Sequence, residues 1–382
     1  MDLGGETNAS TAENTPRVLV TGASGFIACH VVKQLLEEGK FIVRGTVRDL
    51  SVDKKVQPLR NLCPDSKYPL EIVEADLMDE VCWERAAKDC QYVLHMASPF
   101  PASNPKLESD IIEPAVEGTR SVLKACAKCG VKRVVLTSSI AAVSFGHDDS
   151  RVLTEEDWSI ESECFPYAKS KLLAEKEAWK LVEGLPGDEK FELVVINPGL
   201  VYGPVLQGSN CTSMEIPCRL LERQMLMVPK YNLGIVDVRD VAKAHISAIT
   251  APNAPGNRYI AVTGNMWVHE TARILNDEFR PQGYKVPTMV APKLGLYVVA
   301  LFDSSVRMIL PEVGKCVTFS NKKIKEDLGF APRELKDTVI DMAYSMIEQG
   351  FVKKTPKYHG PPATNNSNNH TTNSEESQKV AQ

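Results

Sequence analysis

The sequence of 382 residues lacks an uninterrupted apolar run that could cross a membrane. Its most apolar stretch, Val286 to Phe302, contains Pro287, Pro292 and Lys293, whereas a spanning helix needs about 20 apolar residues. The first residues, MDLGGETNASTAENTP, lack the basic segment and apolar core of a secretory signal. A formal net charge of −5 leaves no basic excess for a nucleic-acid partner. We therefore expect a cytoplasmic protein without a membrane or nucleic-acid partner.

Metal-binding patterns are also scarce. The ten cysteines include a single C-x-x-C, Cys126 to Cys129, which falls in a helical pattern and has no second Cys or His pair at zinc-finger spacing. In the absence of a secretory signal, the cysteines are expected to be reduced thiols. We predict that the chain holds no metal.

What the sequence does contain is an alternation of two periodicities. In the first half, short apolar runs alternate with longer segments of helical spacing. This alternation predicts an α/β fold, a doubly wound parallel (Rossmann) sheet with helices on both faces. The expected strands are Arg17 to Thr21, Phe41 to Val47, Leu70 to Ala75, Tyr92 to His95, Arg133 to Thr137 and Leu193 to Asn197, and the expected helices are Ile27 to Glu38, Ile111 to Cys129 and Tyr167 to Val182.

The second half has a looser pattern with more prolines, and is expected to supply a smaller C-terminal α/β substrate-binding cap. An apolar segment followed by a helical pattern, 233–250, is expected to return to the first domain. The end of the chain is too rich in Asn, Ser and Thr to bury much apolar surface. The predicted boundaries are 1–15 for a flexible N-terminal segment, 16–197 for the doubly wound domain, 198–232 and 251–354 for the cap, and 355–382 for a disordered polar tail.

A glycine-rich turn joins the first expected strand to the first expected helix. It reads Gly22-Ala23-Ser24-Gly25-Phe26-Ile27-Ala28, a G-x-x-G-x-x-A pattern. Glycine permits a sharp turn and close approach of the backbone to a pyrophosphate, and the helix N-terminus supplies N–H groups and a positive dipole end. The turn with its flanking strand and helix therefore predicts a dinucleotide site.

The end of the second expected strand predicts which dinucleotide binds. NAD-binding domains usually place an acidic residue there for the ribose 2′-hydroxyl, but this chain has Arg48. A guanidinium suits a 2′-phosphate, and Lys55 offers a second cation, so we predict NADP(H). Two solvated surface cations are the alternative interpretation, and Asp49 could partly neutralise Arg48.

Three polar residues predict carbonyl chemistry. Tyr167 and Lys171 are four residues apart and share one helix face, and Ser139 follows the strand that ends at Thr137. Carbonyl reduction needs a hydride from the nicotinamide and a proton for the developing alkoxide. Lys171 would stabilise the Tyr167 phenolate, and Ser139 would donate a hydrogen bond to the substrate oxygen.

These motifs together resemble one family. The segments V-T-G-A-S-G-F-I-A, T-V-R-D, A-D-L, T-S-S, Y-x-x-x-K and N-P-x-x-V-x-G-P are similar to those of extended short-chain dehydrogenase/reductases. The resemblance covers Arg17 to Phe351 and is greatest to the branch of dihydroflavonol 4-reductase, cinnamoyl-CoA reductase and fungal aldehyde or methylglyoxal reductases. It implies Ser139, Tyr167 and Lys171 as the catalytic triad, with Ser138 as the neighbour to be distinguished from the catalytic serine.

The resemblance also implies a set of cofactor contacts. Arg48 and Lys55 would bind the 2′-phosphate, Asp76 and Leu77 would lie beside the adenine, and the segment 198–201 would flank the nicotinamide. The full implied set is Gly22, Ser24, Gly25, Phe26, Ile27, Arg48, Lys55, Asp76, Leu77, Ala97, Ser98, Thr137, Tyr167, Lys171, Pro198, Gly199, Leu200 and Val201.

The substrate pocket is expected in the loop 100–105 and the segment 208–227. The second segment contains Met214, Met225 and Met227, for which adaptable pocket lining and plain core filling are the two interpretations. Dihydroflavonol reductases often carry Asn five residues past the catalytic serine, where this chain has Ser144, so a flavonoid substrate is not predicted.

Three other functions share these motifs. Sugar-nucleotide epimerases and dehydratases usually prefer NAD, and Arg48 counts against them. A non-enzymatic NADP-binding redox sensor tends to lose the Tyr or Lys that this chain keeps. A 3-beta-hydroxysteroid-type dehydrogenase would retain every motif and differs only in its pocket. We predict an NADP-dependent oxidoreductase, a carbonyl reductase acting on an aldehyde or ketone, in a monomer or homodimer.

Overall fold

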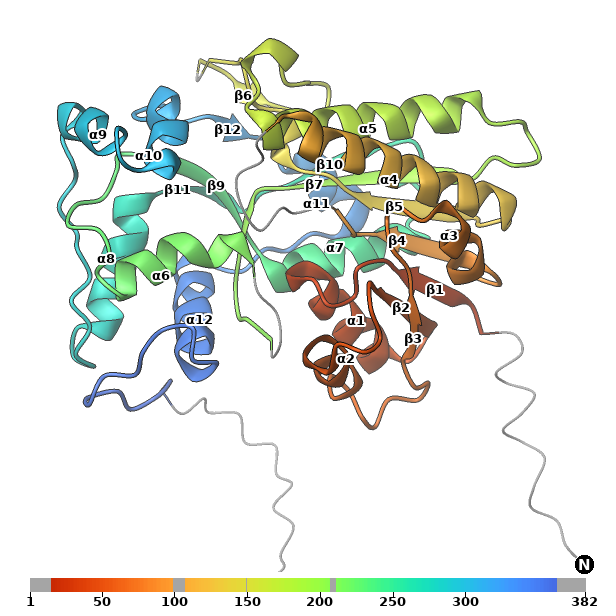
Figure 1. Ribbon diagram of the computed structural model, residues 1–382, viewed down its shortest axis with the longest axis horizontal. Coiled ribbons are helices and arrows are strands. Elements are labelled where there is room, and N and C mark those ends of the chain that lie inside the picture. Colours follow the sequence, from red (N-terminus) through yellow and green to blue (C-terminus); the bar gives the residue numbers. More distant parts are fainter. Residues whose placement is uncertain (1–14, 99–106, 149, 207–210, 363–382) are drawn as a thin grey trace, which may run out of the picture.

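A seven-stranded parallel sheet forms the larger of the two structural units (Figure 1). The computed structural model describes residues 15–98, 107–148, 150–206 and 211–362. The strand order is β10-β7-β5-β4-β1-β2-β3, and every neighbouring pair is parallel. This arrangement confirms the predicted doubly wound sheet. The strands are β1 (Arg17–Val20), β2 (Ile42–Val47), β3 (Glu71–Glu74), β4 (Tyr92–His95), β5 (Arg133–Thr137), β7 (Glu192–Pro198) and β10 (Arg258–Ala261).

Alternating side chains of these strands pack into two hydrophobic cores, one on each face of the sheet. In β1, Val18 and Val20 pack with the helices of one face, and Leu19 packs with those of the other. Helices α1 and α7 lie together on the first face, and α4 contacts both α3 and α5 on the second (Figure 1). The helices around this sheet are α1 (Phe26–Glu38), α2 (Asp53–Arg60), α3 (Glu80–Ala87), α4 (Ser109–Lys128), α5 (Pro166–Gly184), α7 (Val238–Thr250) and α11 (Lys322–Leu328).

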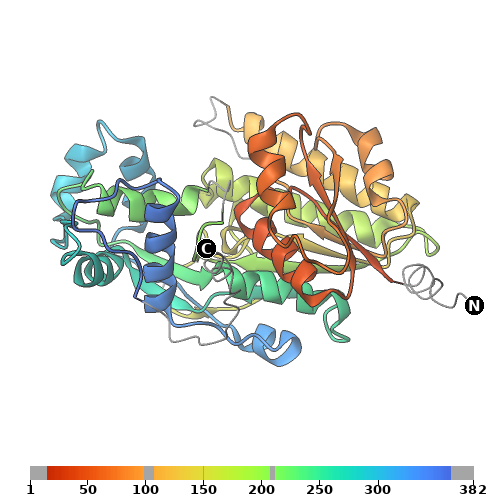
Figure 2. The same cartoon turned by 90° about the horizontal axis from the view of Figure 1, so that it is seen from below.

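A smaller unit is built on a three-stranded sheet, and the two units lie side by side in Figure 2. Its strands are β8 (Leu200–Tyr202), β9 (Asn232–Asp237) and β11 (Gly264–Trp267), with β9 in the centre. The pair β6 (Val152–Leu153) and β12 (Thr318–Phe319) forms a separate ribbon. The remaining helices are α6 (Glu215–Leu221), α8 (Val268–Phe279), α9 (Lys293–Val299), α10 (Ser304–Ile309) and α12 (Leu335–Glu348), with 3₁₀ turns η1 (Ile140–Ala142), η2 (Glu161–Glu163), η3 (Thr212–Met214) and η4 (Leu310–Glu312).

The structure differs from the predicted boundaries in three places. Of the segment 233–250, only the helix α7 packs on the large sheet, because β9 pairs with β8 and β11. Strand β10 lies inside the predicted cap range 251–354 but is an edge strand of the large sheet, next to β7. The predicted polar tail begins too early, since Tyr358 packs against the rings of Tyr284 and Tyr344.

The described residues contain neither a membrane-spanning helix nor a cluster of metal-ligating side chains. Within the described ranges, no helix combines the length and apolar character that a bilayer span needs. Among the same residues, no group of three or more His, Cys, Asp or Glu side chains is placed to hold a metal ion.

Candidate active site

The glycine-rich turn between β1 and α1 is held tightly against neighbouring strands. Gly22 has φ +65°, the left-handed region, and its N–H donates to Thr46 Oγ1 at 2.9 Å. A Cβ at Gly22 would lie 3.1 Å from the Cα of Ala97, so Ala97 at the end of β4 closes one side of the turn. The turn thus needs glycine for both its conformation and its packing.

The turn leaves the N-terminus of α1 open. Gly25 is the N-cap residue, so no side chain caps the helix. In the part of the chain that the structure describes, the N–H groups of Phe26 and Ile27 have no hydrogen-bond acceptor. Unpaired N–H groups at a helix N-terminus bind phosphate, and Ser24 lies within the same turn. This geometry fits the pyrophosphate of a dinucleotide.

Past the end of β2, Arg48 extends into solvent. Its side chain is 80% exposed, and Nε lies 3.5 Å from Oδ2 of Asp76, which follows β3. Oδ1 of Asp49 instead accepts hydrogen bonds from the N–H and the hydroxyl of Ser51. Lys55, in the first turn of α2, is also exposed. Arg48 and Lys55 are therefore accessible to a phosphate group.

Arg44 on β2 is occupied elsewhere. Its guanidinium binds Glu71 at 2.8 Å and the carbonyls of Ala86 and Lys88, which removes it as a phosphate ligand. Leu77 follows Asp76 and packs over Gly118 of α4, where a Cβ would meet it at 3.1 Å.

The three predicted catalytic residues come together at the carboxyl ends of the strands. Tyr167 lies in the first turn of α5 and forms a side-chain hydrogen bond with Ser139. Ser139 follows β5, and its Oγ also accepts from the N–H of Ala141 at 3.1 Å, capping η1. Lys171, one turn along α5, donates from Nζ to Oγ of Ser98 at 3.0 Å and lies 5.9 Å from the centre of the Tyr167 ring.

Burial shifts the pKa values of Tyr167, Lys171 and the neighbouring His95. Burial raises the pKa of Tyr167, and the hydrogen bond with Ser139 opposes that rise by stabilising the phenolate. Burial lowers the pKa of Lys171 to about 8, and the negative charge of Glu175 partly offsets this effect. Burial, together with the nearby Lys171, lowers the pKa of His95 to about 3, so His95 is neutral.

The structure separates the two serines that follow β5. Ser138 is buried, and its Oγ donates to Oε2 of Glu175 at 2.5 Å. Ser139 is the serine that contacts Tyr167. Because the Ser138 hydroxyl is already engaged inside the protein, Ser139 is the serine available to a ligand.

Other implied cofactor residues have different surroundings. The hydroxyl of Thr137 donates to Nε2 of His245 at 2.8 Å, because the other ring nitrogen of His245 donates to the carbonyl of Val241. Pro198 ends β7, and the N–H of Gly199 then donates to the carbonyl of Ala261 at 3.0 Å. Residues Leu200 and Val201 begin β8 and lead the chain into the small sheet.

The expected substrate pocket lies only partly within the structure. The loop 100–105 and residues 208–210 fall outside the described residues. Met214 is 4% exposed and belongs to the main core, as the core-filling interpretation requires. Met227 is 38% exposed, and Met225 packs partly buried against the core.

Sequence reasoning missed a buried polar group behind Ser139, Tyr167 and Lys171. Glu175 of α5 binds Ser138, Asn197 of β7 and Arg258 of β10. The only sequence signal is spacing, since Glu175 lies four residues after Lys171 and eight after Tyr167 on one helix face.

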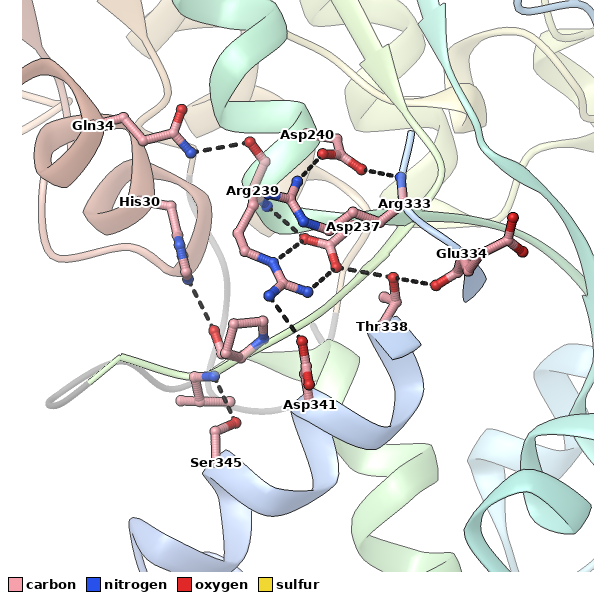
Figure 3. Close-up of polar contacts among 12 residues, drawn as sticks. His30, Gln34, Asp237, Arg239, Asp240, Arg333, Glu334, Thr338, Asp341 and Ser345 are labelled. Carbon is pink, nitrogen blue, oxygen red and sulfur yellow. Dashed lines mark hydrogen bonds and ion pairs between the residues drawn. The ribbon is translucent and has the colours of Figure 1, made fainter. Parts of the chain in front are cut away.

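A second missed cluster joins α1 and α7 of the large unit to β9 and α12 of the small unit (Figure 3). Asp237, at the end of β9, is fully buried and accepts from the Arg239 side chain at 2.7 Å and from Oγ1 of Thr338 on α12 at 2.9 Å. His30 of α1 lies 2.8 Å from the carbonyl of Pro204, which follows β8. The helix that begins at the glycine turn is therefore bonded to the chain that leads into the small unit.

One known family matches the part of the chain that forms the large sheet. The profile of the NAD-dependent epimerase/dehydratase family matches residues 18–262. That range contains the glycine turn, the Ser139–Tyr167–Lys171 group and, apart from Arg17 at the start of β1, the seven strands of the parallel sheet.

Several relatives of this chain are named as reductases. The chain is 38% identical over 269 residues to cinnamoyl-CoA reductase CAD2 of Medicago truncatula, covering 68% of this chain and 80% of that protein. It is 32% identical over 354 residues to the NADPH-dependent methylglyoxal reductase GRE2 of Saccharomyces cerevisiae, covering 87% and 98%. The crystal structure of yeast methylglyoxal/isovaleraldehyde reductase Gre2 complexed with NADPH superposes with a TM-score of 0.70 at 31% identity, again covering 87% and 98%.

Proposed function

This chain belongs to the NAD-dependent epimerase/dehydratase family, and we propose that it reduces the carbonyl group of an aldehyde or ketone with NADPH. The chain is an NADP-dependent oxidoreductase, in line with the NADPH-dependent reductase GRE2 and the NADPH complex of Gre2. The observation that carries the proposal is the group formed by Ser139, Tyr167 and Lys171 beside an open helix N-terminus. A redox sensor that only binds NADP has no need of that group.

Each residue of the group has a distinct role in the proposed reaction. NADPH, when bound, supplies the hydride that adds to the carbonyl carbon. The Tyr167 hydroxyl gives its proton to the carbonyl oxygen, so the products are the alcohol and NADP⁺. Ser139 donates a hydrogen bond to the same oxygen as negative charge develops on it. The ammonium of Lys171 stabilises the Tyr167 phenolate until a proton returns from water.

The residues around the glycine turn suit the cofactor in this proposal. The N–H groups of Phe26 and Ile27 would bind the pyrophosphate, and the exposed guanidinium of Arg48 would bind the 2′-phosphate with Lys55. Ala97 and Ser98, at the end of β4, would lie along the cofactor. Asp76 and Leu77 would lie beside the adenine, and the segment 198–201 would flank the nicotinamide.

The small sheet with α6, α8, α9, α10 and α12 is proposed as the substrate-binding cap. Its chain leaves the large sheet at Pro198 and returns through α7 and β10, so the cap is joined to the cofactor domain at several points. Any substrate held between the two would lie near Ser139 and Tyr167, at the carboxyl ends of β5 and β7.

The proposed function is tested by following NADPH oxidation at 340 nm. The panel consists of aldehydes, diketones, flavonoids and steroids, each assayed with NADPH and with NADH. We expect turnover of aldehydes or diketones with NADPH. Turnover of steroids alone would favour the hydroxysteroid alternative. If no compound of the four groups were turned over, reductase activity on carbonyls would be contradicted.

A further inference from the structure

Glu175 is a carboxylate buried behind the catalytic group. It is 1% exposed and lies one helical turn beyond Lys171 on α5. Its Oε2 accepts from Oγ of Ser138 at 2.5 Å and from Nδ2 of Asn197 at 2.8 Å. Its Oε1 accepts from Nε of Arg258 at 2.6 Å. A buried charge with this many donors is fixed in position.

These contacts reach the catalytic serine by two routes. Ser138, which donates to Glu175, immediately precedes Ser139 in the chain. Asn197 donates from the same Nδ2 to the backbone carbonyl of Ser139 at 3.2 Å. Strands β5 and β7 are neighbours, so Asn197 lies beside the end of β5. Glu175 thereby ties α5, which carries Tyr167, to the backbone that carries Ser139.

Arg258 holds the other oxygen of the carboxylate from β10. It is buried, and Nη1 donates to the carbonyls of Glu155 at 2.8 Å and Asp157 at 2.7 Å. Its guanidinium also stacks 3.7 Å above the ring of Trp158. The arginine is thus immobilised by groups outside the site, and it orients Glu175 rather than a ligand.

The charge of Glu175 also acts on Lys171. Lys171 faces Ser98 and the neutral His95 from the β4 side, and Tyr167 and Glu175 from its own helix. Among these groups, Glu175 carries the opposing negative charge. Its carboxylate opposes the fall in the pKa of Lys171 that burial causes.

We propose that Glu175 is a positioning residue of this site: it fixes Ser139 through Ser138 and Asn197, and it places a negative charge one helical turn from Lys171 on α5. The kinetic part of this inference rests on the proposed function, and the titration part does not. A purely structural Glu175 would affect stability and leave the titration of Lys171 unchanged.

The test compares Glu175→Gln with Glu177→Gln, a substitution two residues away on α5 whose carboxylate pairs with Arg120 instead. Competitive labelling with acetic anhydride, read by peptide mass spectrometry, gives the pKa of Lys171 without any substrate. In Glu175→Gln we expect that pKa to fall by about one unit, because the opposite charge is lost. In Glu177→Gln we expect the wild-type value.

The kinetic readout uses the best substrate of the panel. In Glu175→Gln, kcat should fall roughly tenfold or more with little change in KM, since loss of one oriented hydrogen-bond donor to a developing oxyanion has an effect of this order or larger. The alkaline limit of the kcat profile should move to lower pH, because Lys171 loses its proton earlier. Glu175→Asp keeps the charge and shortens the reach, so it should restore the Lys171 pKa but not kcat.

Distinct outcomes separate the two proposals. A folded Glu175→Gln protein with an unchanged Lys171 pKa and unchanged kcat would overturn the role of Glu175. A shifted Lys171 pKa in a protein that reduces no carbonyl would support Glu175 and count against the proposed function. If Glu175→Gln does not fold, Asn197→Ser takes its place: kcat should fall at constant KM, and an unchanged kcat would overturn the positioning of Ser139.

Discussion

Tyr167 presents its hydroxyl to Ser139 from the first turn of α5, where Phe replacement removes one oxygen and no packing volume. We expect Tyr167→Phe to lower kcat by about 10² to 10⁴-fold, since a positioned acid contributes an effect of that size. NADPH affinity should change less than about twofold, because the phenol is not a phosphate ligand. Stopped-flow NADPH oxidation and fluorescence titration measure the two quantities. Residual turnover near the wild-type level would remove Tyr167 from the mechanism.

Arg48 differs from Arg44 in its freedom to bind a ligand. Arg44 is held by Glu71 and two backbone carbonyls, whereas the Arg48 side chain is 80% exposed. We expect Arg48→Ala to raise the KM for NADPH by roughly 10 to 100-fold, the effect of losing charge-assisted hydrogen bonds worth about 1.5–3 kcal/mol. The KM for NADH should stay constant. Steady-state kinetics with both cofactors provides the comparison.

The matched control for that prediction is Arg60→Ala, which removes an exposed cation from the other end of α2. It should leave both KM values unchanged. An equal rise for NADPH and NADH in Arg48→Ala would mean that Arg48 acts on a part shared by the two cofactors, and would contradict its assignment to the 2′-phosphate.

At the level of elements, periodicity predicted six strands of the large sheet and the helices α1, α4 and α5, but not the shorter helices α2 and α3. The predicted strand Arg133 to Thr137 is β5, and the predicted helix Ile27 to Glu38 is α1 extended by one residue. Both have a regular apolar pattern over one or two faces. Strand β10 was missed because four fully buried residues, Arg258–Ala261, have no alternation that distinguishes a strand from other apolar segments.

The role of the turn between β1 and α1 can be tested with two glycines of similar backbone conformation. Gly22 has φ +65° and Gly130, after α4, has φ +66°, but only Gly22 faces a close neighbour, Ala97. Alanine at either position should cost about 1–2 kcal/mol of unfolding free energy because of the left-handed conformation. Only Gly22→Ala should also weaken NADPH binding, since its Cβ would displace the turn that is proposed to hold the pyrophosphate.

Chemical denaturation and NADPH titration of both variants measure this difference. Equal NADPH affinities in Gly22→Ala and Gly130→Ala would contradict the placement of the pyrophosphate at this turn. A loss of stability in neither variant would contradict the backbone argument instead, so the two causes are separable.

At the scale of the whole molecule, the contacts that complete the site join distant parts of the chain. Glu175 binds Arg258 across 83 residues, and Asp237 binds Thr338 across 101. Tyr167 and Lys171 could be predicted because their spacing is local. The partners of Glu175 depend on which strands lie side by side, and that order follows from the packing of both units rather than from any local pattern.

Three buried histidines give the folded protein a distinctive response to acid. His30, His95 and His245 are at most 4% exposed, and each is hydrogen-bonded within the protein. Burial lowers the pKa of His30 and of His245 to about 4 and that of His95 to about 3. In the unfolded chain each would titrate near pH 6.5, about where a free histidine does.

Because the unfolded state binds these protons first, stability must fall as the pH drops below about 6.5, before most carboxylates titrate. Each histidine should cost about 1.4 kcal/mol at pH 5.5, and the three together about 4 kcal/mol, relative to pH 7.5. Urea unfolding at both pH values measures the difference. The amide of Gln in His30→Gln can still donate to the carbonyl of Pro204. This variant should therefore lose about one third less unfolding free energy between pH 7.5 and pH 5.5. A free energy of unfolding that is constant between these pH values would show that the histidines are solvated or charged in the folded state.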